Sequence, residues 1–331
     1  HERRHDMTIG TRQDFRIAPE EFFGGMVEVV EQNADAFNAA SGGAIRLVPE
    51  RRRGHYAAES FISRVASLVT RRDIDAVTDV ADTPLAQAET VGIKINRRIG
   101  PVANTLDSLR KLGRDPGEMS FLLGRQIGKA VAVDYVDTAL RAASAALAGV
   151  AALDLDVSGE ADPGLAHGTL VRAMARLGDA GGRISCFVMH SKPYYDLMAQ
   201  SVADKVFEVA GVTIYQGTVA SFGRPTLVID SPALVAPGTP DRYRVLGLVE
   251  DAIEVAESEE RSIVSDVITG LENLVMRIQG EYAFNVRLRG FAWDVVAGGI
   301  NPTDAALEQK TNWQVAAADV KSLAGVRLTV A

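Results

Sequence analysis

The most regular hydrophobic pattern in the chain lies between residues 116 and 147 and predicts one long helix. Asp115 suits an N-cap and Pro116 suits the first helical position, and no further proline follows before Leu147. Apolar side chains recur there at helical spacing, at Phe121, Ile127, Val131, Tyr135 and Leu140. Such a helix would be about 45–50 Å long at about 1.5 Å per residue. Because a small compact domain is narrower than this, we expect the helix to form the backbone of an elongated molecule.

Shorter apolar runs on both sides of this helix predict strands and further helices. The predicted strands cover 44–49, 91–102, 183–190, 212–215, 219–222, 225–229, 281–296 and 326–330. Helices are expected from Pro19 to about Asn38, over 165–177 and 193–206, and for a short stretch after Asn301. The alternation over 243–255 is expected to break at the acidic residues 257–260, and the turn-rich segment 153–164 predicts a domain boundary. The chain therefore reads as mixed α+β.

The stretch from Glu50 to about Glu89 has few large apolar residues and many charges. Phe61, Ile62 and Val65 stand at helical spacing, which leaves a short amphipathic helix possible within it. A segment of this composition cannot bury a core of its own. We therefore expect it to be an arm that lies on another surface.

Composition and charge exclude several classes of protein. Of the 331 residues, 47% are hydrophobic and 24% charged, as in a folded globular protein, and the net charge is -8. This charge argues against a single basic domain that grips DNA through its phosphates. The one cysteine, Cys186, rules out an intrachain disulfide and a cysteine-based zinc site. No uncharged apolar run reaches the roughly 20 residues that a membrane-spanning helix needs.

The first methionine is Met7, preceded by His1-Glu2-Arg3-Arg4-His5-Asp6. Glu-Arg-Arg can be encoded by a purine-rich stretch that resembles a ribosome-binding site. We therefore expect the natural chain to start at Met7, and residues 1–6 are left out of the fold prediction.

Candidate catalytic and metal sites are weak. Cys186 and His190 stand four apart in a strand-like run, where a Cys–His pair is conceivable but two core residues at a strand end are favoured. Asp154, Asp156 and Ser158 resemble the first half of a calcium loop, but its twelfth position is a leucine, so a solvated linker is favoured. Recognised phosphate-loop, dinucleotide and hydrolase motifs are missing from the sequence. This pattern favours a structural or binding role, without an enzymatic activity, a cofactor or a metal.

The charged arm carries the most informative charge pattern. Between Arg46 and Arg98 stand nine Arg, one Lys and seven acids, while Glu250 to Glu260 holds six carboxylates. Of the 35 basic residues in the chain, 28 are Arg, whose planar fork pairs with carboxylates even when partly buried. A solvated charge run, a nucleic-acid arm and an inter-subunit arm all remain open, and the last fits best. The candidate inter-subunit contacts are Arg51, Arg52, Arg53, Arg71, Arg72, Glu257, Glu259 and Glu260.

Several segments taken together resemble the major capsid proteins of tailed bacteriophages. They are Phe37–Leu47, Glu59–Phe61, Arg71–Asp73, Lys94–Val102, Val188–Leu197, Arg289–Trp293, Ile300–Ala305 and Asn312–Trp313. Each motif alone is weak, but their order and spacing are fairly specific. The resemblance covers nearly the whole chain after Met7.

The resemblance implies the α+β fold of HK-ninety-seven-like phage capsids. By analogy, residues 7–44 would form an N-terminal arm, and 45–95 an extended loop with its base strands. Residues 96–160 would form a peripheral domain with a spine helix over 116–147, 161–280 an axial domain, and 281–331 the return strand and C-terminal segment. Such proteins assemble in the host cytoplasm as hexamers and pentamers that close into an icosahedral head around double-stranded DNA.

The resemblance also implies partners. These are further copies of the chain, a portal protein and a scaffolding protein, with a decoration protein left open and DNA contacted only weakly and non-specifically. Some relatives weld subunits through a lysine in the extended loop, but no lysine occurs before Gly92 here, so we expect no such crosslink. Two other classes stay open. They are an encapsulin-type shell that packages a cargo enzyme and a soluble α+β hydrolase using Cys186 and His190.

Overall fold

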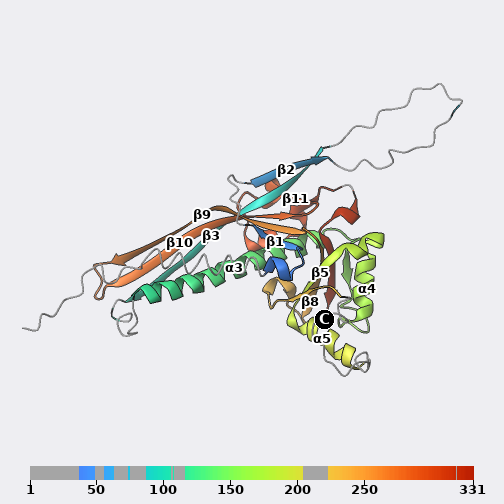
Figure 1. The fold of residues 1–331 in the computed structure, drawn as a ribbon, viewed down its shortest axis with the longest axis horizontal. Coiled ribbons are helices and arrows are strands. Elements are labelled where there is room, and N and C mark those ends of the chain that lie inside the picture. Colours follow the sequence, from blue (N-terminus) through green and yellow to red (C-terminus); the bar gives the residue numbers. More distant parts are fainter. Residues whose placement is uncertain are drawn as a thin grey trace, which may run out of the picture. The chain divides into compact units, whose positions relative to one another are not determined.

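A computed structural model describes residues 37–48, 56–62, 74, 87–105, 107, 116–203, 223–317 and 319–331. The chain divides into two compact units, and Figure 1 shows their elements. In the first unit the described residues belong to Asn96–Asp134 and Glu259–Ala283. In the second unit they belong to Ala36–Ile95, Tyr135–Ser258 and Phe284–Ala331.

Helix α3, Pro116–Ala148, confirms the long helix predicted over 116–147. From Ile127 to Tyr135 one stripe of the helix is buried, which includes Ile127, Val131 and Tyr135. From Ala142 to Leu147 every side chain is buried, so the last turns lie within the core of the second unit. This change of burial along one helix explains why an apolar stripe gives way to an alanine-rich run.

A five-stranded sheet has the order β1-β9-β10-β3-β2. Its strands are β1 Ile45–Val48, β9 Ile253–Ile268, β10 Val275–Leu288, β3 Gln87–Thr105 and β2 Tyr56–Ile62. Strand β1 runs parallel to β9, with Ile45 opposite Ile253, and β2 runs antiparallel to β3, with Tyr56 opposite Ile93. Strands β3, β9 and β10 are long enough to contribute residues to both units.

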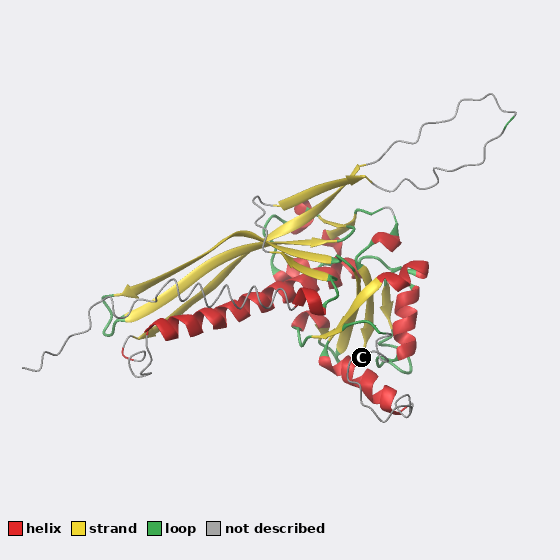
Figure 2. Ribbon diagram, viewed as in Figure 1, coloured by secondary structure: helices red, strands yellow, loops and turns green. Residues whose placement is uncertain are grey.

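A six-stranded sheet forms the core of the second unit, with helices beside it (Figure 2). Its main path is β4-β13-β8-β5-β6, and β7 pairs with β8. The strands are β4 Asp154–Asp156, β5 Ile184–Met189, β6 Thr226–Val228, β7 Val235–Ala236, β8 Arg242–Val249 and β13 Gly325–Val330. The helices are α4 His167–Ala175 and α5 Ser191–Ala203, with 3₁₀ turns at Gly178–Arg183, Pro232–Leu234 and Val320–Ser322. Phe187, Leu246 and Leu328 are fully or almost fully buried in this sheet.

A small two-stranded ribbon completes the second unit. Strand β11, Phe291–Trp293, runs antiparallel to β12, Trp313–Val315. Between them lie the short helices α6 Val295–Gly298 and α7 Asp304–Leu307 and a 3₁₀ turn at Lys310–Asn312. Thr303 caps α7 by accepting a hydrogen bond from the Ala306 amide, which confirms the short helix predicted after Asn301.

The structure corrects four predictions. The strand predicted over 281–296 is two strands, because Gly290, at a φ of 76°, turns the chain between β10 and β11. The acidic residues 257–260 do not end a strand. They lie within β9, which is paired with β10 through backbone hydrogen bonds. Phe61 and Ile62 lie in strand β2 rather than in a helix. The segment 153–164 is not made of turns alone, because it contains the short strand β4, paired in parallel with β13.

Other expectations are confirmed or fall elsewhere. Strands predicted at 44–49, 91–102, 183–190, 225–229 and 326–330 match β1, β3, β5, β6 and β13, and the helices at 165–177 and 193–206 match α4 and α5. The strands predicted at 212–215 and 219–222 lie outside the described residues, as does most of the helix expected from Pro19 to Asn38.

Candidate assembly surfaces

The five arginines predicted to contact a neighbouring subunit, Arg51, Arg52, Arg53, Arg71 and Arg72, lie outside the described residues. In the sequence, Arg51, Arg52 and Arg53 stand between β1 and β2, whereas Arg71 and Arg72 stand between β2 and β3. Strands β2 and β3 pair from Tyr56↔Ile93 to Ile62↔Gln87. This pairing places Ile62 opposite Gln87, and these two residues are the ends between which residues 63–86 connect the strands.

The acidic candidates lie on strand β9. Glu257 is half-buried, and its carboxylate accepts a hydrogen bond of 3.4 Å from the hydroxyl of Tyr135 in the same chain. Glu254 pairs with Arg287 at 2.5 Å, and Asp251 pairs with Arg46 at 3.1 Å. Of the six acids in the run from Glu250 to Glu260, three are therefore bound by groups of their own subunit. The backbones of Glu259 and Glu260 are in β9, but their side chains are outside the described part.

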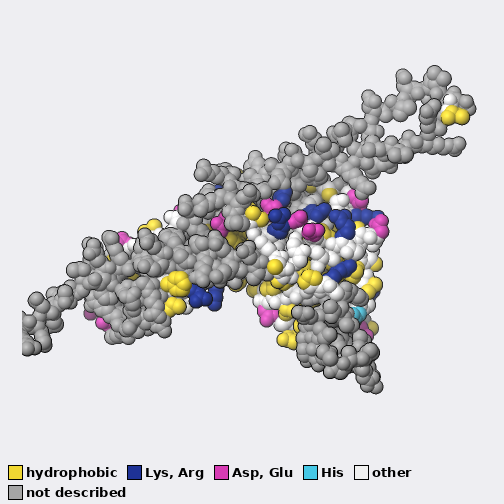
Figure 3. Space-filling model, viewed as in Figure 1, with side chains coloured by type: hydrophobic (Ala, Val, Ile, Leu, Met, Phe, Trp, Pro, Cys, Tyr) yellow, Lys and Arg dark blue, Asp and Glu magenta, His cyan; other side chains and the backbone are white. Residues whose placement is uncertain are grey.

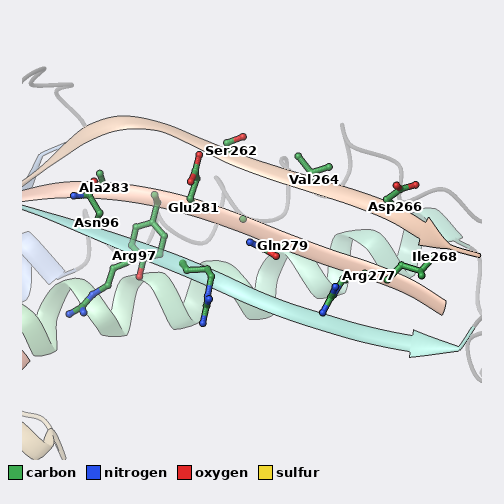
Figure 4. Close-up of a pocket in the computed structure, with 13 residues that line it drawn as sticks. Asn96, Arg97, Ser262, Val264, Asp266, Ile268, Arg277, Gln279, Glu281 and Ala283 are labelled. Atoms are coloured by element: carbon green, nitrogen blue, oxygen red, sulfur yellow. The ribbon is translucent and has the colours of Figure 1, made fainter. Parts of the chain in front are cut away.

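The first unit exposes a broad hollow of about 780 Å³ on one face of its sheet (Figure 4). Along β10 the exposed residues Arg277, Gln279 and Glu281 alternate with buried Ile278 and Gly280, as expected for a sheet with one solvated face. The remaining lining residues are Asn96, Arg97, Arg98, Ser262, Val264, Asp266, Ile268, Tyr282 and Ala283. Because both signs of charge line the hollow, it does not form a uniformly basic surface.

Asp134 on α3 ties the helix to the strands of the first unit. Its Oδ2 accepts hydrogen bonds from the Tyr282 hydroxyl on β10 at 2.7 Å and from Nε of Arg97 on β3 at 3.2 Å. The side chains of Arg97 and Asp134 are only 22% and 28% exposed. The sequence held no signal for this contact, because Asp134 and Tyr282 are 148 residues apart.

Replacing Asp134 with alanine is expected to lower the free energy of unfolding by about 2–4 kcal/mol, because two bonds to one charged acceptor are lost. The matched control is Tyr282→Phe, which removes one of the two bonds and is expected to cost about 1–2 kcal/mol. Denaturant titration of both variants measures these differences. An Asp134→Ala variant as stable as the unmodified chain would contradict the role given to this carboxylate.

A second polar network surrounds the C-terminal half of α3. Nε of Arg141 lies 2.7 Å from Oδ2 of Asp137, and the same arginine pairs with Glu308 beyond α7. Although burial lowers the pKa of Arg141, the bond and charge of Asp137 outweigh it and the pKa is raised. Asp137 also accepts a hydrogen bond from the Ser231 hydroxyl. These contacts fasten the helix to the segments around it, and they use charged groups for structure.

Cys186 lies within β5, and His190 is the first residue after that strand. Cys186 is fully buried, and burial raises the pKa of its thiol to about 12. The His190 ring packs against Tyr243 at 5.2 Å and its Nε2 lies 3.4 Å from Oδ1 of Asp230. A buried thiol held in its protonated form is a poor nucleophile. The interpretation of Cys186 as a core residue is confirmed.

The thiol of Cys186 is therefore expected to resist modification. In the native protein at neutral pH its reaction with a maleimide should be more than about a hundredfold slower than in denaturant, because the thiolate is scarce and shielded. Mass spectrometry of samples quenched over time measures both rates. Equal rates would show a reactive cysteine and would restore the hydrolase hypothesis.

The segment that resembled a calcium loop uses its carboxylates within the chain. Oδ1 of Asp154 lies 3.3 Å from Nε of Arg327, and burial raises the pKa of Asp154 against the opposing charge of that arginine. Oδ1 of Asp156 accepts bonds from the amide and the hydroxyl of Ser158. Among the described residues, no three His, Cys, Asp or Glu side chains are grouped as a metal ion requires.

Charges of both signs are mixed on the visible face of the described part, where basic and acidic side chains lie next to one another (Figure 3).

Among the described helices, none has the length and apolar character that are needed to cross a bilayer.

Comparison with known proteins gives a family and a fold. A family model for major capsid protein 13-like proteins matches residues 14–327. A structure from Microbacterium phage Oxtober96 superposes with a TM-score of 0.50 at 12% identity, covering 86% of this chain and 88% of that chain. The satellite phage P4 procapsid gives 0.49 at 10% identity (92% and 89% covered), and the capsid of Ralstonia phage GP4 gives 0.48 at 12% (88% and 87%). A search among curated proteins finds no match.

The Oxtober96 structure confirms the α+β fold that the sequence motifs suggested. The family model begins seven residues after Met7 and ends four residues before Ala331. Because the match spans almost the whole chain, the protein belongs to the major capsid protein 13-like family and is a phage major capsid protein of the virion shell.

Proposed function

We propose that this chain assembles with copies of itself, as hexamers and pentamers, into the icosahedral head that encloses the double-stranded DNA of a tailed phage. The observation that carries the proposal is the family match over residues 14–327. The role is structural, without catalysis, which agrees with a cysteine that is buried and protonated.

The charge of the chain supports a container for DNA rather than a DNA-gripping protein. A net charge of -8 and a visible face with both signs intermixed favour weak, non-specific contact with the packaged duplex. Weak contact suits the function, since strong adhesion between shell and DNA would oppose packaging and ejection.

The division into parts is proposed along the following lines. Residues 7–44 would form the N-terminal arm, 45–95 the extended loop and its base strands, and 96–160 the peripheral domain around α3. Strands β9 and β10 belong to the same sheet as β3, which favours an axial domain that ends near residue 252, before β9, rather than at 280. The segment 281–331 would supply the return strand of the peripheral domain, within β10, and the C-terminal segment, whose strand β13 pairs with β4 and β8. Portal and scaffolding proteins are the proposed partners during assembly.

The subunit contacts are proposed to join the arginines of the loop to acids of a neighbouring copy. Glu257 contacts Tyr135 within its own chain, so it is the weaker of the acidic candidates. Glu259 and Glu260 are the better ones. Bidentate Arg–carboxylate pairs are suited to such a contact because they combine charge with a fixed geometry.

Particles isolated from phage-producing cells test the proposal. We expect them to contain this chain as the most abundant protein together with nuclease-protected double-stranded DNA. Particles that hold an enzyme and no protected DNA would contradict the proposal and would favour the encapsulin alternative.

A further inference from the structure

An uncharged apolar turn stands out on the second unit, between β11 and β12. It comprises residues 295–300 and is called the Val296 turn below. Val296 is 98% exposed and Ile300 is 54% exposed. The nine residues from Val295 to Thr303 include no charged side chain. Single exposed valines are ordinary, so exposure alone would mean little.

The Val296 turn differs from an ordinary loop because it is held rigidly. The carboxylate of Asp294 accepts hydrogen bonds from the amides of Val296 at 2.9 Å and Ala297 at 3.0 Å. The side-chain amide of Gln314 donates to the other oxygen of Asp294 at 2.7 Å. These bonds stabilise the ionised carboxylate and lower the pKa of Asp294. The backbone that presents Val296 is therefore fixed from one side.

The side chains of Trp293 and Trp313 support the Val296 turn on the side that faces the interior of the unit. Nε1 of Trp293 donates to the carbonyl of Gly299 at 2.9 Å, and its ring meets Trp313 edge-on at 4.9 Å. A Cβ atom on Gly298 would lie only 2.1 Å from the Trp293 ring, so the turn sits directly on the indole. Both tryptophans are buried. An apolar side chain held on such a base loses little entropy when it is covered by a partner.

We propose that the Val296 turn docks against a second copy of this chain in the assembled shell. The inference rests on the proposed function, because it requires that copies of the chain pack together. Two exposed aliphatic side chains bury far less than the roughly 800 Å² per partner of a stable interface. The contact should therefore form between copies that other contacts already hold, rather than in an isolated dimer.

A second copy offers surface of the matching chemistry. The segment around the end of β9 and the start of β10 exposes Val264, Leu271 and Leu274. The Val296 turn lacks charges of its own, and contact with these three aliphatic side chains would bury no unpaired charge. The exposed acids of the same segment, Asp266 and Glu272, would then lie at the rim of the contact, where charged groups stay in water. An anionic partner such as DNA would find no cation on the turn.

Replacing Val296 with aspartate tests the inference. We expect the yield of closed particles to fall at least tenfold, because a charge would be buried without a partner. The isolated subunit should keep its melting temperature, since Val296 touches little within its own chain. Gln309→Asp adds the same charge at an exposed polar position and should assemble normally. A normal particle yield from Val296→Asp would overturn the inference.

Thiol protection gives a second readout that does not depend on an assembly defect. The variants Val296→Cys and Val171→Cys each place a thiol at an exposed position, while the native cysteine is buried. In free subunits both introduced thiols should react with a maleimide. In particles the thiol at position 296 should react at least tenfold more slowly and the one on α4 should stay reactive. Equal rates for the two thiols in particles would contradict the inference.

The two claims fail in different ways. If the unmodified chain builds no shell, the proposed function fails. If it builds shells in which position 296 remains as reactive as in the free subunit, only the inference about the Val296 turn fails.

Discussion

Replacing Arg51, Arg52 and Arg53 together with glutamate is expected to abolish closed particles while leaving the subunit folded. The three side chains are proposed to pair with carboxylates of a neighbouring copy, and each reversed charge would face an acid. Removing one partner of a buried ion pair costs about 3–5 kcal/mol, and three such losses recur at every contact in a shell. Electron microscopy and sedimentation of the variant measure the yield of particles, and thermal unfolding of the subunit shows whether it stays folded.

The matched control keeps the positive charges but removes the planar guanidinium groups. The triple variant to lysine should assemble, though less completely, because lysine cannot make bidentate pairs. A compensating variant sharpens the test. Glu259→Arg combined with Glu260→Arg should restore part of the yield in the glutamate background if these acids are the partners. Normal particles from the glutamate variant would refute the inter-subunit role of the loop.

Replacing Gly325 with alanine is expected to destabilise the second unit strongly. Gly325 opens β13 at a φ of 151°, and a Cβ atom there would lie 2.0 Å from the carbonyl oxygen of Gly247 on β8. The obstacle is backbone within a paired strand, so it cannot rotate away as a side chain would. We expect the free energy of unfolding to fall by more than about 3 kcal/mol, measured by denaturant titration.

Gly159→Ala is the control for this change. Its φ lies outside the left-handed region, and an added Cβ would have no atom within 4 Å. Its effect on the free energy of unfolding should stay within about 0.5 kcal/mol. If Gly325→Ala were no more destabilising than Gly159→Ala, the close approach of β13 to β8 would be wrong.

The elements that could be predicted are those whose signals are local. The N-cap expected at Asp115 and the regular apolar spacing that follows predicted α3 within one residue of its end. Strand β5 was predictable because a buried strand is a continuous apolar run. The strand end expected at 257–260 was wrong because local composition alone does not decide strand formation. Glutamates disfavour a strand locally, but pairing with β10 overrides that preference.

The contacts that assemble these elements carry no local signal. Ile45 lies beside Ile253, and Asp134 binds Tyr282, although each pair is far apart in the chain. The Val296 turn was not predictable either, because its rigidity depends on Gln314 and Trp313, which arrive from β12. For the assembly surface, the Arg-rich loop was identified from composition. Its residues stay a prediction, because they lie outside the described part of the chain.

Cryo-electron microscopy of particles purified from the phage-producing host shows whether this chain builds the shell. We expect a closed icosahedral shell whose repeated density fits this fold, with α3 and the five-stranded sheet recognisable in every copy. A shell built from a different protein, with this chain absent from it, would show that the chain is not the capsid subunit.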